Sequence, residues 1–242
     1  MSAAREPEGG ALAARWAAVR ARVRAAAERA GRDPDDVILI AVSKNHPVEA
    51  VAEAVAAGAR DLGENYVQEL VSKRAATAGL APAPRWHFIG RLQRNKARLI
   101  AGQVELVHAV DSLALARELG KRATAPQPVL LAVNVAGEET KAGLSVAEAL
   151  AQARELYAVP GLRWRGLMTM PPPAEDPEAS RPSFAALAAL RRRLEDHLGE
   201  ALPVLSMGMS DDFEVAISEG ATHVRIGTAI FGARAARPVS DP

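Results

Sequence analysis

The feature that most constrains the fold is a regular alternation, between residues 37 and 227, of short apolar runs and segments with apolar residues at helical spacing. Short runs rich in β-branched residues, bounded by polar residues or glycine, are typical of strands buried on both faces. Strands that alternate with amphipathic helices predict successive parallel βα units. The eight runs lie at residues 37–44, 59–65, 85–90, 104–110, 129–135, 162–170, 203–207 and 223–227.

Eight such units in a row narrow the choice of fold class. Parallel units joined by right-handed crossovers close into a (β/α)8 TIM barrel. An open, doubly wound sheet is the alternative, but such sheets rarely carry this many uninterrupted units. We therefore predict an α/β protein built as a single-domain (β/α)8 barrel.

An extra helix is predicted ahead of the barrel, and Gly31 marks its end. Its apolar residues recur at helical spacing, at Leu12, Trp16, Val19 and Val23. No linker or shift in composition divides the 242 residues, and barrels of this size are single domains. We expect one domain over residues 1–242, with residues 1–10 and 236–242 flexible.

Composition and charge exclude several classes of protein. Lys and Arg number 30 against 29 Asp and Glu, so nothing draws the whole chain to nucleic acid or an anionic membrane. The absence of cysteine excludes disulfides and thiolate metal sites, and it is typical of a reducing compartment. Neither a membrane-spanning run nor a secretory signal is recognisable. We expect a cytoplasmic protein without nucleic-acid or membrane partners, and we take it to be a monomer.

The predicted first helix is rich in arginine, which allows two interpretations. The arginines are Arg15, Arg20, Arg22, Arg24 and Arg29. Binding to nucleic acid would be favoured by aromatic residues interleaved with the charges, and no such platform is present. A solvated helix face is the favoured interpretation.

Lys44 ends the first apolar run and is the leading candidate for chemistry. The carboxyl ends of parallel strands form the active face of α/β folds. An ammonium at the mouth of an apolar pocket loses hydration and its pKa falls; the neutral amine then forms a Schiff base with an aldehyde. The alternative for a single strand-end lysine is a side chain that extends to solvent.

The loops after the seventh and eighth runs form a predicted phosphate site. Residues 206–212 place glycine and serine hydroxyls at the start of one helix, and residues 225–232 place glycine and threonine at the start of another. Helix starts bind phosphate through unpaired N–H groups, and these loops are the usual phosphate site of a TIM barrel. Either loop alone is also consistent with ordinary turn and N-cap residues.

Other polar residues allow a structural interpretation. Asp211 and Asp212 suit the first turn of a helix and, without a histidine beside them, do not indicate a metal. His87 lies within the third run, either as a satisfied core histidine or in contact with a ligand, and His46 and His108 are left as structural or solvent-facing. The methionines near the strand ends, Met168, Met170, Met207 and Met209, are consistent with packing.

A single ligand would explain why the amine of Lys44 and the two predicted phosphate-binding loops lie at the same end of the barrel. Pyridoxal 5′-phosphate (PLP) has an aldehyde for Lys44 and a phosphate for the two loops. Arg225 precedes the second loop and is expected to face the pyridine nitrogen, which a protonated guanidinium would keep unprotonated. That weakens the ring as an electron sink, which a carboxylate partner would strengthen. A salt bridge at the barrel rim is the alternative for Arg225.

Six segments carry a family likeness: residues 41–44, 63–66, 86–96, 166–168, 206–211 and 225–228. Together they resemble the pyridoxal phosphate homeostasis proteins, from about residue 12 to residue 232. The resemblance implies a single alanine-racemase-like barrel that holds PLP as a Schiff base on Lys44. With the two loops, it gives as cofactor-binding residues Lys44, Asn65, His87, Ser206, Met207, Gly208, Ser210, Arg225, Gly227 and Thr228.

One departure from the family pattern follows the site lysine. The family usually has Thr and Lys there, whereas this chain has Asn45 and His46. The departure leaves the Schiff base on Lys44 intact. It removes a second lysine, proposed as an acceptor or relay during cofactor transfer.

The resemblance implies a carrier or regulator in vitamin B6 homeostasis, with PLP-dependent apoenzymes as expected partners. The alternative is a PLP-dependent amino-acid racemase, which needs an acid/base on each face of its substrate. Lys44 can serve one face, and the tyrosines are Tyr66, at the start of the second helix of the barrel, and Tyr157, which looks structural. A third interpretation is a Schiff-base enzyme for a sugar phosphate. We expect little or no racemisation of alanine.

Overall fold

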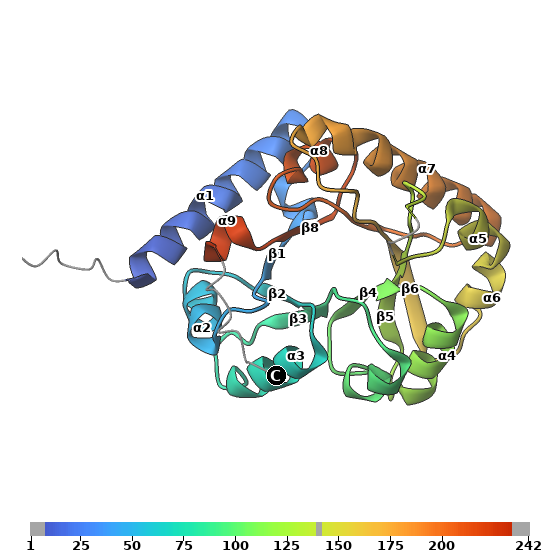
Figure 1. Cartoon of the computed structure of the whole chain (residues 1–242), viewed down its shortest axis with the longest axis horizontal. Coiled ribbons are helices and arrows are strands. Elements are labelled where there is room, and N and C mark those ends of the chain that lie inside the picture. Colours follow the sequence, from blue (N-terminus) through green and yellow to red (C-terminus); the bar gives the residue numbers. More distant parts are fainter. Residues whose placement is uncertain (1–7, 139–141, 234–242) are drawn as a thin grey trace, which may run out of the picture.

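The computed structural model describes residues 8–138 and 142–233, and within them the strands form a closed parallel barrel (Figure 1). The strands follow one another around the barrel in sequence order, and the first pairs with the last. They are β1 Ile38–Val42, β2 Asp61–Glu64, β3 Arg85–Phe88, β4 Leu106–Val110, β5 Gln127–Ala132, β6 Leu162–Met168, β7 Val204–Ser206 and β8 His223–Ile226. This topology confirms the predicted (β/α)8 barrel.

Helices ring the barrel on its outside (Figure 1). The α-helices are α1 Glu8–Arg29, α2 Val48–Ala56, α3 Val67–Ala76, α4 Leu113–Arg122, α5 Val146–Ala151, α6 Ala153–Tyr157, α7 Arg181–Leu198, α8 Phe213–Ser218 and α9 Thr228–Phe231. Short 3₁₀ helices are η1 Pro34–Asp36, η2 Arg94–Leu99 and η3 Pro177–Ser180.

Local signals explain where several helices begin. The Ser112 hydroxyl accepts a hydrogen bond from the amide of Leu115, and Ser145 and Glu148 form a capping box. The helical segment predicted after β3 forms a 3₁₀ helix, η2, and not an α-helix. Its N-cap, Gln93, makes no capping hydrogen bond through its side chain.

Helix α1 packs against the outside of the barrel, beside α2, α8 and α9 (Figure 1). Two of its arginines bind groups on α9 and α8 and are not simply solvated. Arg15 Nε donates to the carbonyl oxygen of Ile230 at 2.7 Å, and Arg22 forms a two-point ion pair with Glu214. The expectation that residues 1–10 are flexible needs correction, since α1 begins at Glu8; residues 1–7 and 236–242 lie outside the described part.

The apolar core lies mainly between the barrel and its helices. Inside the barrel, Leu106, Leu130 and Val204 form a small separate apolar cluster against Met168. The strands also bury polar side chains, among them Asp61, His87, His108, Ser206, His223 and Arg225. Burying polar groups costs free energy unless they are hydrogen-bonded, so this polar interior must be internally satisfied.

Within the described ranges, no helix combines the length and apolarity needed to cross a membrane.

Candidate functional site

A cavity of about 500 Å³ opens at the carboxyl ends of the strands. Each strand, or the loop directly after it, contributes to the lining. Six of the predicted cofactor-binding residues lie on it: Lys44, Asn65, Ser210, Arg225, Gly227 and Thr228. The structure thus brings the candidate amine and the candidate phosphate loops to one cavity.

Lys44 stands on a turn whose neighbouring residues are both held by other elements. The carbonyl oxygen of Ser43 accepts a 2.8 Å hydrogen bond from Nζ of Lys73, and the amide of Asn45 donates one of 2.9 Å to Glu69. Asn45 has a φ of 62°, a left-handed conformation that asparagine tolerates better than most residues. The backbone on both sides of Lys44 is therefore fixed.

Beneath this turn lies a buried charge cluster that the sequence analysis missed. Nζ of Lys73 lies 2.6 Å from Oε1 of Glu64 and 2.9 Å from Oε2 of Glu69. The hydroxyl of Ser43 donates to the same Glu64 oxygen at 2.7 Å. Burial raises the pKa of Glu64, although hydrogen bonds from Lys73 and Ser43 oppose the rise. The spacing of Glu69 and Lys73 on one helix was the available signal.

The two predicted phosphate loops meet through their hydroxyl groups. Oγ1 of Thr228 donates to Oγ of Ser210 at 3.1 Å. A Cβ on Gly227 would lie 3.2 Å from the carbonyl oxygen of Val42, so the loop approaches β1 closely. The carboxylate of Asp212 accepts a 2.7 Å hydrogen bond from the amide of Met209, which stabilises the loop. Across the described residues, no histidine and carboxylate group is arranged to hold a metal.

Arg225 reaches the cavity from β8, although it is almost fully buried. Its Nη1 donates to the hydroxyl of Ser206 at 2.6 Å, and its Nη2 donates to the carbonyl oxygen of Thr169 at 3.0 Å. Burial lowers the pKa of Arg225 to about 10, with Asp212 opposing the decrease. The guanidinium therefore stays charged at neutral pH and is held by two neutral oxygens.

Comparison with known proteins decides the family. The model of the alanine racemase N-terminal domain matches residues 15–235. A pyridoxal phosphate homeostasis protein of Pseudomonas aeruginosa is 50% identical over 226 residues, which cover 92% of this chain and 96% of the relative. The Escherichia coli protein of the same name is 43% identical over 235 residues, with 92% and 97% covered. The chain belongs to the pyridoxal phosphate homeostasis protein family.

Solved structures agree with this membership. PipY of Synechococcus elongatus superposes with a TM-score of 0.81, over 91% of this chain and all of PipY. It was solved without PLP, where the identity is 37%, and with PLP bound, where it is 36%. Alanine racemase from Corynebacterium glutamicum has a TM-score of 0.70 at 21% identity and is covered over 63% of its length. That likeness shows a shared fold.

In this member of the pyridoxal phosphate homeostasis protein family, a row of buried hydrogen bonds runs behind Arg225. Nδ1 of His108 lies 2.8 Å from the Ser206 hydroxyl. Its Nε2 lies 3.1 Å from Nδ1 of His87, whose Nε2 lies 3.0 Å from Oδ1 of Asp61. We refer to Ser206, His108, His87 and Asp61 as the polar row.

The groups at the two ends of the polar row, Asp61 and the Ser206 hydroxyl that accepts from Arg225, limit how its hydrogen bonds can run. Hydrogen bonds from His87 and Arg85 lower the pKa of Asp61 despite its burial, so Asp61 is an acceptor. Burial lowers the pKa of His108 well below the usual value, with the nearby cations adding to the effect. When each imidazole carries one hydrogen, His87 donates to Asp61, His108 donates to His87, and Ser206 donates to His108. Ser206 is then left to accept from Arg225.

Four predicted cofactor-binding residues of this family member do not line the cavity. His87 is 1% exposed and lies in the polar row, which matches the core interpretation. Ser206 accepts a hydrogen bond from Arg225, which lines the cavity. Met207 is buried, and Gly208 has a φ of 92° in the turn before α8, where a Cβ would lie 2.6 Å from Ala216. Direct contact between these four residues and a cofactor stays a prediction without support from this geometry.

Both tyrosines lie away from the lining of the Lys44 cavity. Tyr66 is the N-cap of α3, is half exposed and faces a neighbouring depression. Tyr157 stacks on Trp164 at 4.9 Å between ring centroids, and burial raises its pKa. The structural interpretation of Tyr157 is therefore supported, and Tyr66 does not face Lys44 across the cavity.

Proposed function

We propose that this chain binds pyridoxal 5′-phosphate in the Lys44 cavity and acts as its carrier and regulator in vitamin B6 homeostasis. The observation that carries the proposal is that Lys44 shares one cavity with Arg225 and the Ser210–Thr228 pair. Support comes from the names of its relatives and from the PLP-bound structure of PipY.

The donor and acceptor groups of the cavity fit this cofactor. Oδ1 of Asn65 is buried and has no hydrogen-bond partner within the described part of the chain, although Asn65 lines the cavity. A buried polar atom without a partner is unusual in a folded protein, and a ligand that donates a hydrogen bond would satisfy it. Lys44 supplies an amine, and the paired loops supply the hydroxyls of Ser210 and Thr228.

In this proposal, each group of the chain has a separate task. Lys44 holds the aldehyde, the hydroxyls of Ser210 and Thr228 hold the phosphate, and Arg225 faces the ring nitrogen. Bound PLP supplies an aldehyde that reacts with amines and a ring that accepts electrons. Because Arg225 remains protonated, it disfavours protonation of the ring, which limits electron withdrawal. The arrangement therefore favours holding the cofactor over catalytic turnover.

Borohydride reduction followed by peptide mapping tests the site. Protein loaded with PLP and reduced should carry phosphopyridoxyl on Lys44, and the visible absorbance of the bound cofactor should disappear. Lys44→Ala should prevent labelling, whereas Lys121→Ala, on the exposed side of α4, should not. Label on a different lysine in the unaltered protein would contradict the assignment.

A measurement of catalytic turnover distinguishes a PLP carrier from an amino-acid racemase. The cavity lining includes no tyrosine to act opposite Lys44. Loaded protein should exchange the α-hydrogen of L-alanine with deuterated solvent no faster than free PLP does. Rapid exchange that Lys44→Ala abolishes would favour a racemase, and a colourless protein that forms borohydride adducts with a sugar phosphate would favour the third interpretation.

The proposal includes a cytoplasmic monomer that delivers PLP to apoenzymes. Cell fractionation and analytical ultracentrifugation test the first two parts. Activation of a PLP-dependent apoenzyme by loaded protein, at a rate above that of release into buffer, tests delivery.

A further inference from the structure

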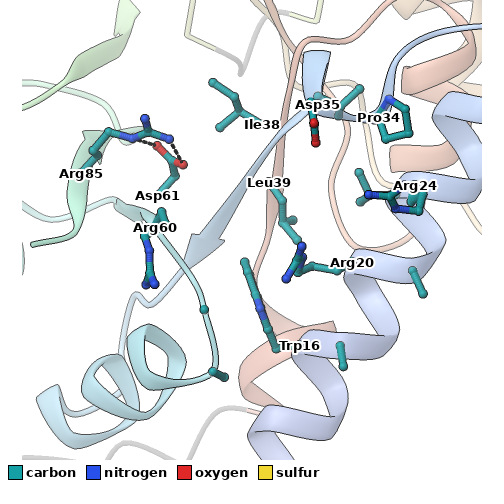
Figure 2. A pocket seen from close by; sticks show the side chains of 16 residues that line it. Trp16, Arg20, Arg24, Pro34, Asp35, Ile38, Leu39, Arg60, Asp61 and Arg85 are labelled. Atoms are coloured by element: carbon teal, nitrogen blue, oxygen red, sulfur yellow. Dashed lines mark hydrogen bonds and ion pairs between the residues drawn. The ribbon is translucent and has the colours of Figure 1, made fainter. Parts of the chain in front are cut away.

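A second cavity, of about 630 Å³, opens at the end of the barrel opposite Lys44. It lies between α1, η1 and the first residues of β1, β2 and β3, as Figure 2 shows. None of its lining residues also lines the Lys44 cavity. We refer to it as the amino-end cavity.

The lining of the amino-end cavity is positively charged. It contains the arginines Arg20, Arg24, Arg60 and Arg85 and the carboxylates Asp35 and Asp61. Asp61 is neutralised where it lies, because Arg85 binds it through two hydrogen bonds of 2.8 and 2.6 Å (Figure 2). Arg24 lies 3.8 Å from Glu28, outside the lining, so Arg20 and Arg60 face the single carboxylate of Asp35 and leave an excess of one positive charge.

One of these arginines is held in place by the backbone. Nη1 of Arg60 donates to the carbonyl oxygens of Val55 and Ala59, both at 3.1 Å. A guanidinium carries five N–H donors in a planar fork, so these two bonds orient the group without exhausting it. A pre-oriented guanidinium loses less entropy when it binds an oxyanion.

Trp16 gives an independent indication of a ligand site. Its side chain is 4% exposed and lines the amino-end cavity, yet its buried indole Nε1 has no hydrogen-bond partner among the described residues. A buried indole N–H usually has an acceptor. Gly58 lies opposite with a φ of 106°, and a Cβ there would be 3.6 Å from this nitrogen. The space beside the N–H group is therefore left open by a glycine.

We propose that the amino-end cavity binds a small molecule that carries a phosphate group on an apolar body. Arginine forks match phosphate oxygens in geometry and charge, and the indole N–H adds one more donor. Val37, Ile38 and Leu39 provide an apolar wall for the rest of the molecule. The volume is within the usual range for sites of small ligands. This site is separate from the proposed PLP site and does not depend on it.

Tryptophan fluorescence and calorimetry with phenyl phosphate as the probe test the proposal. Titration should give a saturable change in fluorescence, and Trp16→Phe should remove most of that change. Arg20→Gln with Arg60→Gln should raise the dissociation constant at least tenfold, because two exposed cations are lost without disturbing the core. The matched control, Arg192→Gln with Arg193→Gln on the exposed face of α7, should leave the constant unchanged.

A further variant separates the two cavities. Thr228→Val weakens only phosphate binding in the Lys44 cavity, so it should not change the calorimetric constant for the amino-end cavity. Equal constants for the Arg20→Gln/Arg60→Gln protein and the unaltered protein would overturn the proposal. So would a constant that responds to Thr228→Val instead, or the absence of saturable heat.

Discussion

Arg225 donates a hydrogen bond of 2.6 Å from Nη1 to the hydroxyl of Ser206. The same hydroxyl lies 2.8 Å from Nδ1 of His108, so Arg225 is connected through Ser206 to the polar row. The position of Arg225 at the cavity is thus linked to side chains in the centre of the barrel.

Ser206→Ala should destabilise the protein by about 1–3 kcal/mol, since it leaves a donor of Arg225 and an acceptor of His108 buried and unpaired. Urea unfolding measures the change. Ser210→Ala, which removes a partly exposed hydrogen bond, should cost less than about 0.5 kcal/mol and serves as the control. If the two variants lose the same free energy of unfolding, burial of the Ser206 hydrogen bonds does not increase their contribution to stability.

Stability should fall as the pH decreases below about 6.5, because burial keeps two histidines neutral in the fold. Burial lowers the pKa of His223 from 6.5 to about 3, and it also lowers that of His108. Above pH 6.5 both states are neutral at these residues; below it, the unfolded chain binds protons that the folded one does not. Each histidine then costs about 1.4 kcal/mol per pH unit.

Denaturant unfolding between pH 7.5 and 4.5 measures this pH dependence. His223→Asn should flatten the curve, whereas His197→Asn, on the exposed end of α7, should not. The raised pKa of Glu64 acts in the opposite direction, since the folded state then binds the extra proton. A stability that is constant over this range would contradict neutral histidines in the barrel.

Lys73→Met should destabilise the protein by about 3–5 kcal/mol, because it leaves the buried carboxylate of Glu64 without its cation. Combining it with Glu64→Leu should recover much of the loss, since no uncompensated charge remains. Both proteins are compared by chemical unfolding. If the double variant is no more stable than Lys73→Met, the cost comes from packing and not from charge.

Asn45→Ala should lose about 1 kcal/mol, because any Cβ lies close to the backbone in the left-handed conformation and alanine lacks the polar side chain with which asparagine offsets that contact. Asn45→Gly should be close to neutral, since glycine adopts this φ without that contact. Thermal unfolding distinguishes the two. Because this residue follows Lys44, Asn45→Ala should also speed the release of bound PLP, and identical release rates would show that the turn does not position the amine.

The barrel and its rim were predictable because their signals are local. The alternation of apolar runs and helical segments gave the eight units, and a strand-end position placed Lys44 on the rim. The loops that carry Ser210 and Thr228 followed from their places after the last two strands. These inferences need only periodicity and the common direction of parallel strands.

The polar row was not predictable, because it depends on how distant strands pair. Alternation along β3 shows that His87 faces one side, but it does not give the stagger that brings His108 of β4 and Ser206 of β7 within reach. For the same reason His108 was assigned to solvent or structure and His87 to the cofactor. Lys73 was missed because a lysine on an amphipathic helix is normally exposed, and only the fold shows that Glu64 lies beneath it.

Asp61 belongs both to the polar row and to the wall of the amino-end cavity. Asp61 therefore connects the amino-end cavity to the polar row inside the barrel. An anion that drew Arg85 away from Asp61 would remove a cation from one end of the polar row, whose other end is the Ser206 hydroxyl beside Arg225. Binding of an anion in the amino-end cavity would then change the charge balance behind Arg225, which lines the Lys44 cavity at the other end of the barrel.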